Sequence, residues 1–318
     1  MKNLSAPSDL WKSWLYQLEF LKYIPDEFLR LHVGFGYYLG APIESDLFRV
    51  SKSINGEKIK NNKIIEDYKK ITKGLPNRFL LSEKDKNNKL ISTIYKLGDN
   101  SIKYINTDIV RMQVDVANMY NLGVIQNAKS ILEIGGGYGQ LASGVLNAKK
   151  NISYAIIDFP EILEIIFRWV KHSQKNIKVI RHKETNDIKL DLHKPGLHLI
   201  PNTLTGIIKN KFDLVININS FCEMTDSQVK KYLRNINFTT GFLYTNNRDK
   251  QYQNKEISSL SKLIASTGYS IWPLNEAYNK IDYKKKVFVL YDNKYNKPNL
   301  ISIGRIHGIL GRETPAVN

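Results

Sequence analysis

The chain of 318 residues contains one cysteine, Cys222, so it can form no internal disulfide and offers no cysteine-based metal site. No apolar run approaches the roughly 20 residues that cross a bilayer, and the first residues lack the apolar stretch of a signal peptide. Histidine and carboxylate residues show no standard ligand spacing either, so no essential metal is expected. These absences argue against a disulfide-stabilised or membrane-spanning protein, and they predict a cytoplasmic one.

Acidic residues are the minority, with 30 Asp and Glu against 47 Lys and Arg and a net charge of +17. One interpretation is a surface for nucleic acid or anionic lipid. However, lysine supplies 37 of the basic residues and asparagine is also frequent at 31, whereas a dedicated phosphate-binding surface would use more arginine. We therefore expect no nucleic-acid partner, while peripheral contact with a membrane stays open. The sequence does not indicate an oligomeric state.

Apolar residues change their spacing near residue 125. Before it they recur at helical intervals, as in a first helix whose Trp11 and Trp14 suit a buried face, and in a later helix that Thr107 could cap. After it, short apolar strands alternate with amphipathic helices, which is typical of a parallel α/β sheet. The predicted units are a mainly helical cap or substrate region over 1–125, a catalytic domain over 126–295 and a tail over 296–318.

The strands of the catalytic domain can be placed from their apolar runs. The third is ambiguous, and we prefer 197–200 over 177–180 because it leaves a shorter connection to the strand that follows. The last two strands have no helix between them and should pair antiparallel. The other strands are expected at 130–134, 152–157, 212–217, 242–244, 269–274 and 287–291.

Glycines follow the first of these strands in the run Glu133-Ile134-Gly135-Gly136-Gly137-Tyr138-Gly139. They allow a tight turn and a close approach to a ligand. Gly137, Gly139 and Ala142 also fit the dinucleotide pattern, so the loop alone does not separate nicotinamide from adenosylmethionine cofactors. Glu133 favours the second, because a carboxylate would repel a pyrophosphate and attract a sulfonium with its ammonium group.

Asp158 ends the next strand, 23 positions after Gly135, where an acid accepts hydrogen bonds from ribose hydroxyls. It could also cap the helix that begins at Pro160. Phe159 could stack on an adenine or belong to the core. The residues predicted to bind the cofactor are Glu133, Gly135, Gly136, Gly137, Tyr138, Asp158, Phe159 and Asn217.

Three stretches carry a resemblance to a known family: residues 132–139, 157–161 and 212–224, the last ending in Asn219-Ser220-Phe221-Cys222-Glu223-Met224. From about residue 104 to residue 292 the chain resembles the sugar O-methyltransferases, a branch of the class I S-adenosylmethionine-dependent methyltransferases. The resemblance implies a Rossmann-like, seven-stranded, mostly parallel sheet that ends in an antiparallel hairpin. It also implies S-adenosyl-L-methionine as cofactor and a sugar hydroxyl as acceptor.

Methyl transfer to a neutral hydroxyl calls for a general base. Glu223 is the candidate, with Asn219 beside it, because both follow the strand 212–217, whose end faces the cofactor crevice. Glu223 could instead cap the helix that opens near Thr225, and His193 and His198 are then the next candidates. Contacts with the acceptor are expected from Ser220, Asn246, Arg248 and Arg111, of which Arg248 suits a phosphate or carboxylate.

The sequence therefore predicts a sugar O-methyltransferase of polysaccharide, glycolipid or glycosylated-metabolite synthesis. Three alternatives stay open. The acceptor could be a small molecule other than a sugar, the chain could be a non-catalytic cofactor-binding partner of a glycan enzyme, or the substrate could be RNA, which only the net charge supports.

Overall fold

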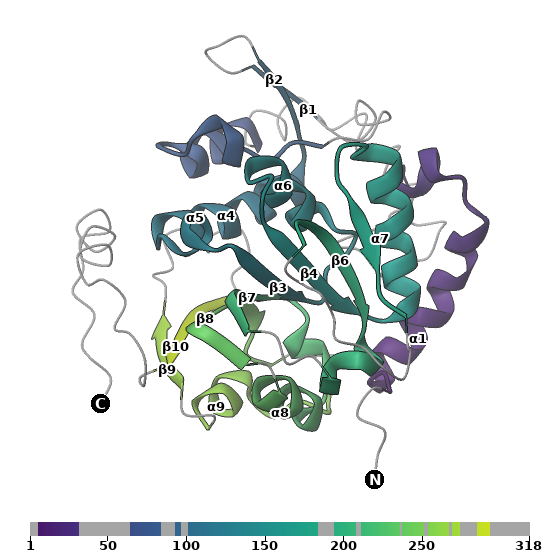
Figure 1. Cartoon of the computed structure of the whole chain (residues 1–318), viewed down its shortest axis with the longest axis vertical. Helices are drawn as coiled ribbons and strands as arrows, with labels where there is room; N and C mark the ends of the chain where they lie inside the picture. Colours follow the sequence, from purple (N-terminus) through teal and green to yellow (C-terminus); the bar gives the residue numbers. More distant parts are fainter. Residues whose placement is uncertain are drawn as a thin grey trace.

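The computed structural model describes residues 6–31, 64–83, 93–96, 101–183, 194–207, 211–235, 237–250, 254–266, 269–273 and 285–292. The expected tail over 296–318 and His193 lie outside these ranges. Within them, one large sheet carries helices on both of its faces, and a two-stranded hairpin extends to one side (Figure 1). The hairpin strands are β1 (Thr93–Lys96) and β2 (Ile102–Ile105).

The large sheet has the order β5-β6-β4-β3-β7-β8-β10-β9. Its first six strands are parallel, and β10 runs antiparallel to both of its neighbours, β8 and β9. From β3 the chain first adds β4 on one side of the sheet and later β7 and β8 on the other, so the topological switch point lies between β3 and β7. The bounds are β3 (Ser130–Ile134), β4 (Ser153–Asp158), β5 (Val179–Arg181), β6 (Gly196–Pro201), β7 (Lys211–Ile218), β8 (Asn237–Arg248), β9 (Tyr269–Pro273) and β10 (Lys285–Asp292).

The Rossmann-like α/β class and the terminal antiparallel pair are confirmed. The expected count of seven strands is not, because the large sheet has eight strands among the described residues. Both candidates for the third strand exist. The preferred one is β6, which pairs with β4, and the other is β5, which extends the sheet beyond β6. The strand expected at 242–244 is also longer, since β8 runs to Arg248, and Asn246 therefore lies inside it.

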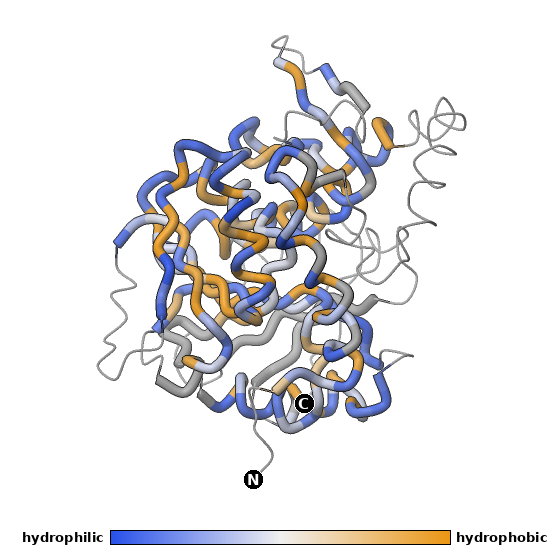
Figure 2. Tube along the Cα trace, turned by 90° about the vertical axis from the view of Figure 1, so that its right-hand side faces the viewer, coloured by the Kyte–Doolittle hydropathy of each residue, from blue (hydrophilic) through white to orange (hydrophobic). Residues whose placement is uncertain are grey.

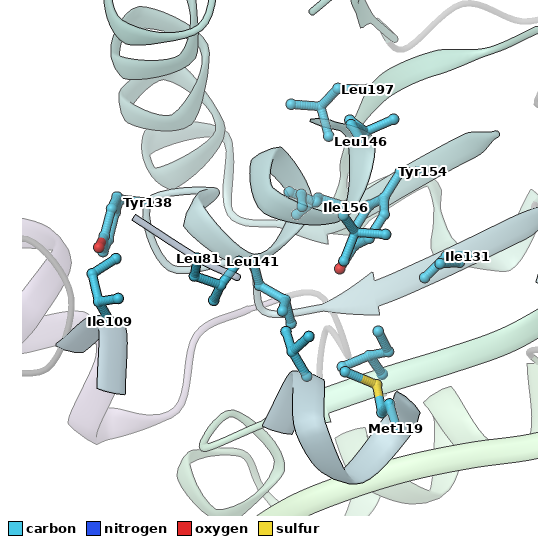
Figure 3. Packing of buried hydrophobic residues seen from close by; sticks show 14 of the residues in the cluster. Leu81, Ile109, Met119, Ile131, Tyr138, Leu141, Leu146, Tyr154, Ile156 and Leu197 are labelled. Atoms are coloured by element: carbon cyan, nitrogen blue, oxygen red, sulfur yellow. The ribbon is translucent and has the colours of Figure 1, made fainter. Parts of the chain in front are cut away.

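Two apolar layers pack on the sheet because successive strand residues point to opposite faces. On one face Ile131 and Tyr154 belong to the same apolar cluster as Ile109 and Met119 of α4 and Leu141 of α6 (Figure 3). Side chains of α7 join this cluster. The other face packs against α8 and α9. Figure 2 shows the apolar strands inside this arrangement. The helices are α4 (Thr107–Asn121), α5 (Val124–Asn127), α6 (Gln140–Ala148), α7 (Pro160–Ser173), α8 (Asp226–Asn235) and α9 (Leu260–Ala265).

Asn106, rather than Thr107, caps the start of α4. Its side chain accepts a hydrogen bond from the Ile109 N–H at 3.0 Å, which satisfies one of the N–H groups that a helix start leaves unpaired. Asp115 of this helix contacts Tyr244 and Asn246 near the end of β8, so α4 reaches the edge of the sheet where the parallel strands finish. None of the helices in the described ranges combines the length and the apolar character needed to cross a membrane.

The N-terminal segment over 6–31 lies along α7 (Figure 1). It consists of α1 (Asp9–Leu18), η1 (Glu19–Tyr23) and η2 (Asp26–Leu31). Arg168 of α7 holds it with three donors: Nε to Asp26 Oδ1 at 2.7 Å, Nη1 to the Leu21 carbonyl at 2.8 Å, and Nη2 to the Ile24 carbonyl. The other short helical segments are residues 64–72, η3 (Asn77–Phe79), η4 (Asn202–Ile207) and η5 (Phe221–Glu223).

Candidate active site

The glycine loop joins β3 to α6 at the switch point. Gly135, Gly137 and Gly139 have φ values of 79°, 57° and 85°, in the left-handed region that favours glycine. A Cβ on Gly135 would clash with the side chain of Ser220, so this glycine lets the end of β7 approach the loop. A Cβ on Gly137 would meet nothing within 4 Å, so the space beside this residue is open to a ligand.

Asp158 fastens this loop to the end of β4. Its Oδ2 accepts a hydrogen bond from the Gly136 N–H at 2.9 Å, and its Oδ1 accepts one from the Phe159 N–H at 2.8 Å. The N-cap of α7 is Phe159, with no side-chain cap, so Asp158 does not cap the helix. Desolvation, with a smaller effect of the Glu161 charge, raises the pKa of Asp158 to about 7. Each carboxylate oxygen can accept a second hydrogen bond, which leaves capacity for ribose hydroxyls.

Glu133 is 3% exposed and lies on the α4 face of β3. Its Oε2 accepts a hydrogen bond from the Tyr154 hydroxyl at 2.9 Å. Burial raises the pKa of Glu133 to about 8; the Tyr154 hydrogen bond opposes this rise, and the charges of Asp158 and Asp115 add to it. The carboxyl is therefore mostly protonated at neutral pH, and a nearby cation would favour its ionised form.

A second polar group, the α4–β8 cluster, consists of Asp115, Tyr244 and Asn246. Asp115 Oδ1 accepts hydrogen bonds from the Tyr244 hydroxyl at 2.6 Å and from Asn246 Nδ2 at 2.7 Å. Asn118 Nδ2 donates to the same hydroxyl at 3.3 Å. Asn246 is 6% exposed, and within the described ranges its buried Oδ1 has no hydrogen-bond partner. A buried acceptor without a donor costs about 1–3 kcal/mol, so a ligand that donates a hydrogen bond to Asn246 Oδ1 would remove this cost.

Asn217 anchors the end of β7 from the opposite face of the sheet. Its Nδ2 donates to the Ile134 carbonyl at 2.7 Å, and its Oδ1 accepts from the Phe221 N–H at 3.0 Å and from Asn247 Nδ2 at 2.8 Å. Both polar atoms of this side chain therefore take part in internal hydrogen bonds. Asn217, predicted as a cofactor contact, is placed to hold β3, β8 and η5 together.

Asn219 and Glu223 lie on the turn after β7, next to the glycine loop. Asn219 has a φ of 58°, the one positive value outside glycine in the described ranges, and such strain concentrates at functional sites. Its N–H donates to the Asn246 carbonyl at 2.9 Å. The Thr225 hydroxyl, rather than Glu223, accepts the Gln228 N–H at 3.2 Å at the start of α8. The fold thus brings both predicted catalytic residues to the edge of the sheet beside Ser220 and Gly135.

The N-terminal segment crosses this edge. The Ser8 hydroxyl donates to the Glu223 carbonyl at 2.7 Å, and Gln228 Nε2 donates to the Ala6 carbonyl at 2.6 Å. Farther along, the ring of Trp11 packs on Phe159 at 5.4 Å. The segment therefore spans from the end of β7 to the end of β4. Trp11 and Trp14, expected in the core, are only partly buried.

The other predicted residues are more dispersed. The Tyr138 ring is buried against Trp169, with the ring centroids 5.0 Å apart. Arg111 stands four residues before Asp115 on the same face of α4. Arg248 ends β8 opposite Lys285 of β10.

His198 lies in the middle of β6 rather than at its end. Its Nδ1 is 3.0 Å from His182 Nε2, and its Nε2 is 2.8 Å from the Lys194 carbonyl. Its side chain is fully buried, so it is part of a structural pair and cannot serve as the alternative base. The described residues contain no group of three or more His, Cys, Asp or Glu that could hold a metal.

Asp115 is the residue that sequence reasoning missed. It belongs to no motif, and its hydrogen-bond partners Tyr244 and Asn246 are 129 and 131 residues away in the chain. Nothing in the local sequence distinguishes Asp115 from a surface acid until the strand that faces it is known. Tyr154, the partner of Glu133, was missed for the same reason.

These features define a Rossmann-like α/β protein with the reversed terminal strand of the methyltransferase type. The sequence matches no model of a known protein family and no curated protein sequence. Among solved structures it is similar to an O-methyltransferase family protein from Burkholderia thailandensis, with 9% identity over 57% of this chain and 58% of that chain and a TM-score of 0.39.

Two further matches are human N-acetylserotonin methyltransferase in complex with S-adenosylmethionine and the fibrillarin pre-rRNA processing protein of Methanococcus jannaschii. The first has 11% identity over 57% of this chain and 54% of that chain, with a TM-score of 0.35. The second has 13% identity over 63% and 82%, with a TM-score of 0.39. The chain spans less than two thirds of the Burkholderia and human proteins.

Proposed function

We propose that the chain is an S-adenosylmethionine-dependent O-methyltransferase. The observation that carries this proposal is the hydrogen bond from Gly136 to Asp158, which couples a glycine loop to an acid at the end of the neighbouring strand. In a doubly wound sheet this pair lies at the switch point, where nucleoside ligands bind. The reversed β10 favours the methyltransferase type of sheet over the dinucleotide type.

The charges around the loop favour the same cofactor. Glu133, Asp158 and Asp115 bring three carboxyl groups close enough that the charges of the last two raise the pKa of the first. A dinucleotide would add a pyrophosphate anion to this group, whereas a sulfonium with an ammonium group would compensate it. When bound, S-adenosylmethionine supplies an electrophilic methyl group.

The chain's own residues then have distinct tasks. Asp158 and the loop backbone hold the ribose side, and the open space beside Gly137 admits the ligand. Asn219 and Glu223 lie on the turn after β7, where an acceptor hydroxyl can be aligned with the methyl group. Glu223 is the proposed general base that takes the hydroxyl proton.

A sugar or glycoconjugate hydroxyl is the proposed acceptor. The stretch 212–224, which carries the resemblance to sugar O-methyltransferases, forms the turn beside the glycine loop. The partly exposed rings of Trp11 and Trp14 lie on the segment that crosses the site, and aromatic faces of this kind suit the apolar face of a sugar ring.

This acceptor can be tested with a panel of nucleotide sugars and a glycan extract, with total RNA and phenolic small molecules as comparisons. The measurement is release of S-adenosylhomocysteine together with the mass gain of one methyl group on the product. Methylation of a sugar supports the proposal. Methylation confined to RNA or to the phenols would overturn the sugar acceptor and keep the methyltransferase.

Replacing Glu223 with Gln tests the proposed base. We expect turnover to fall by roughly a hundredfold to ten thousandfold, because an amide cannot accept the proton, while affinity for S-adenosylhomocysteine stays within about twofold. The side-chain volume barely changes, and the hydrogen bond from Ser8 goes to the backbone carbonyl of this residue, which the substitution retains. Near-normal turnover in the folded variant would show that another group takes the proton.

A further inference from the structure

Two neighbouring asparagines end β8, and they differ in how fully their side chains are used. Asn247 donates from Nδ2 to Asn217 Oδ1 and to Thr245 Oγ1, and its Oδ1 accepts from the Cys222 N–H at 3.3 Å. Asn246 points to the opposite face and donates from Nδ2 to Asp115, while its buried Oδ1 has no hydrogen-bond partner among the residues that the structure describes. Both polar atoms of the Asn247 side chain therefore make hydrogen bonds within the fold. The Asn246 side chain uses its donor, and its acceptor Oδ1 is available to a ligand.

The hydrogen bond to Asp115 determines which end of the Asn246 amide faces the acid. Asp115 Oδ1 already accepts from the Tyr244 hydroxyl at 2.6 Å and can receive only a donor from its other side. If the amide turned round, its oxygen would face this carboxylate oxygen. Oδ1 of Asn246 must therefore point away from its own hydrogen bond, and it offers a lone pair beside a buried acid.

Strand register places this acceptor at the crevice. Ile216 pairs with both Glu133 of β3 and Tyr244 of β8, so these side chains share one face of the sheet. Asn246 stands two residues beyond Tyr244 and pairs with Ile218, level with the first glycine of the loop. Its carbonyl also accepts the N–H of Asn219, the strained residue of the next turn. The free oxygen is thus on the α4 side of the proposed cofactor site.

The surroundings select the ligand group. Besides Asn246 Oδ1, this face carries the carboxyls of Asp115 and Glu133, and the charge of Asp115 raises the pKa of Glu133. A ligand carboxylate, phosphate or ketone has only acceptor oxygens, so it could not donate a hydrogen bond to Asn246 Oδ1. An ammonium group offers three donors and a positive charge that the carboxyls attract. Arg111, four residues before Asp115 on α4, supplies the opposite charge that the carboxylate next to an α-ammonium requires.

We propose that Asn246 Oδ1 and Asp115 form a subsite for a primary ammonium group, the amino group at the methionine end of the cofactor. This inference rests on the proposed function and adds two residues to it. It also reassigns Asn246, which the sequence placed among the contacts with the acceptor. Asp115 acts here by holding the amide in its orientation and by contributing negative charge.

The test is calorimetry with two ligands. S-adenosylhomocysteine has the amino-acid end, and 5′-methylthioadenosine keeps the adenosyl thioether without it. Asn246→Leu removes the acceptor at similar side-chain size. We expect it to weaken binding of S-adenosylhomocysteine at least tenfold and to leave binding of 5′-methylthioadenosine within twofold. Asn118→Ala is the matched control, because it removes a donor to Tyr244 from the same network without touching the proposed subsite, and it should change neither affinity.

Each outcome separates the two claims. If the wild type binds neither ligand, the proposed function fails. If it binds both and Asn246→Leu changes neither affinity, or weakens both equally, the ammonium subsite is wrong and the acceptor serves another ligand. Should Asn246→Leu not fold, Asp115→Asn keeps an oxygen for Tyr244 and removes the charge, with the same expected difference between the ligands. The wild type gives a third check, since the deamino analogue of S-adenosylhomocysteine should bind at least tenfold more weakly than the parent.

Discussion

At the scale of single residues, the site is a group of carboxyls whose charges are compensated incompletely by the protein. Glu133 receives one hydrogen bond from Tyr154, and Asp158 receives two from backbone N–H groups. Desolvation nevertheless raises their pKa values to about 8 and about 7. Raised pKa values mean that each carboxyl favours its neutral form in the fold, and that a bound cation reverses the preference.

A proton should therefore be released when the cofactor binds. With a pKa of about 8, Glu133 is roughly nine-tenths protonated at pH 7, and the ammonium and sulfonium charges lower that pKa on binding. Calorimetry of S-adenosylmethionine in buffers of different ionisation enthalpy measures the release, which we expect to approach one proton at pH 7 and to shrink above pH 9. In Glu133→Gln the number of protons released should fall to the contribution of Asp158 alone. Equal proton counts in the wild type and this variant would contradict the assignment.

The sequence predicted part of this site, for a reason that individual residues make clear. Glu133 and Asp158 stand at fixed offsets from a glycine loop, so their positions follow from local sequence. Asp115 and Tyr154 act through partners on other elements, which only the register of the sheet brings together. The pattern near Asn246 did place it at the sheet edge but could not show which of its atoms is free.

At the scale of elements, the contact between the glycine loop and the turn after β7 defines the shape of the site. Gly135 allows Ser220 to pack where a side chain would otherwise lie. Asn217 then ties the same turn to β3 through the Ile134 carbonyl. Loop and turn are thus held together by both close packing and a buried hydrogen bond, so displacing one should displace the other.

Gly135→Ala should be more destabilising than its backbone angle alone accounts for. A left-handed alanine costs about 1–2 kcal/mol, and here the new methyl also clashes with Ser220. Gly123→Ala is the matched control, with a φ of 75° and nothing within 4 Å of an added Cβ. Urea unfolding should show a loss of about 1 kcal/mol for Gly123→Ala and about 3 kcal/mol or more for Gly135→Ala. Equal losses would mean that the loop and the turn are not in contact.

Element by element, the sequence was most informative for buried parallel strands. The runs at 130–134, 152–157 and 212–217 lie within one residue of β3, β4 and the core of β7, because strands covered on both faces are continuously apolar. The sequence was less informative for β5, the strand at the edge of the sheet. β5 is short and only partly buried, so the apolar runs that form β5 and β6 were treated as alternatives for the third strand. The sheet contains both.

At the scale of the whole molecule, the N-terminal segment joins parts that lie far apart in the sequence. Ser8 contacts Glu223 across 215 positions, and Arg168 of α7 reaches Asp26 across 142. No local pattern predicts such contacts, which is why a helical cap region could be predicted from the sequence but its position could not. The structure sets this segment over the edge of the sheet that carries the proposed site.

Arg168→Ala should release the segment without unfolding the sheet. The guanidinium supplies one ion pair and two hydrogen bonds to carbonyls, and hydrogen bonds to charged groups contribute about 1.5–3 kcal/mol each. We expect faster proteolytic cleavage within 9–31 and an unchanged strand content by circular dichroism. Arg181→Ala removes an exposed pair with Glu164 and is the control. Cleavage at the wild-type rate in Arg168→Ala would show that other contacts hold the segment.

The central claim is that this sheet binds an adenosylmethionine cofactor rather than a dinucleotide. Its most direct test is calorimetry of the wild-type chain with S-adenosylhomocysteine and, separately, with NAD at neutral pH. The buried carboxyls of Glu133 and Asp158 and the link from Asp158 to Gly136 predict saturable one-to-one binding of S-adenosylhomocysteine and no measurable binding of NAD. Tighter binding of NAD, or no binding of S-adenosylhomocysteine by folded protein, would contradict the account.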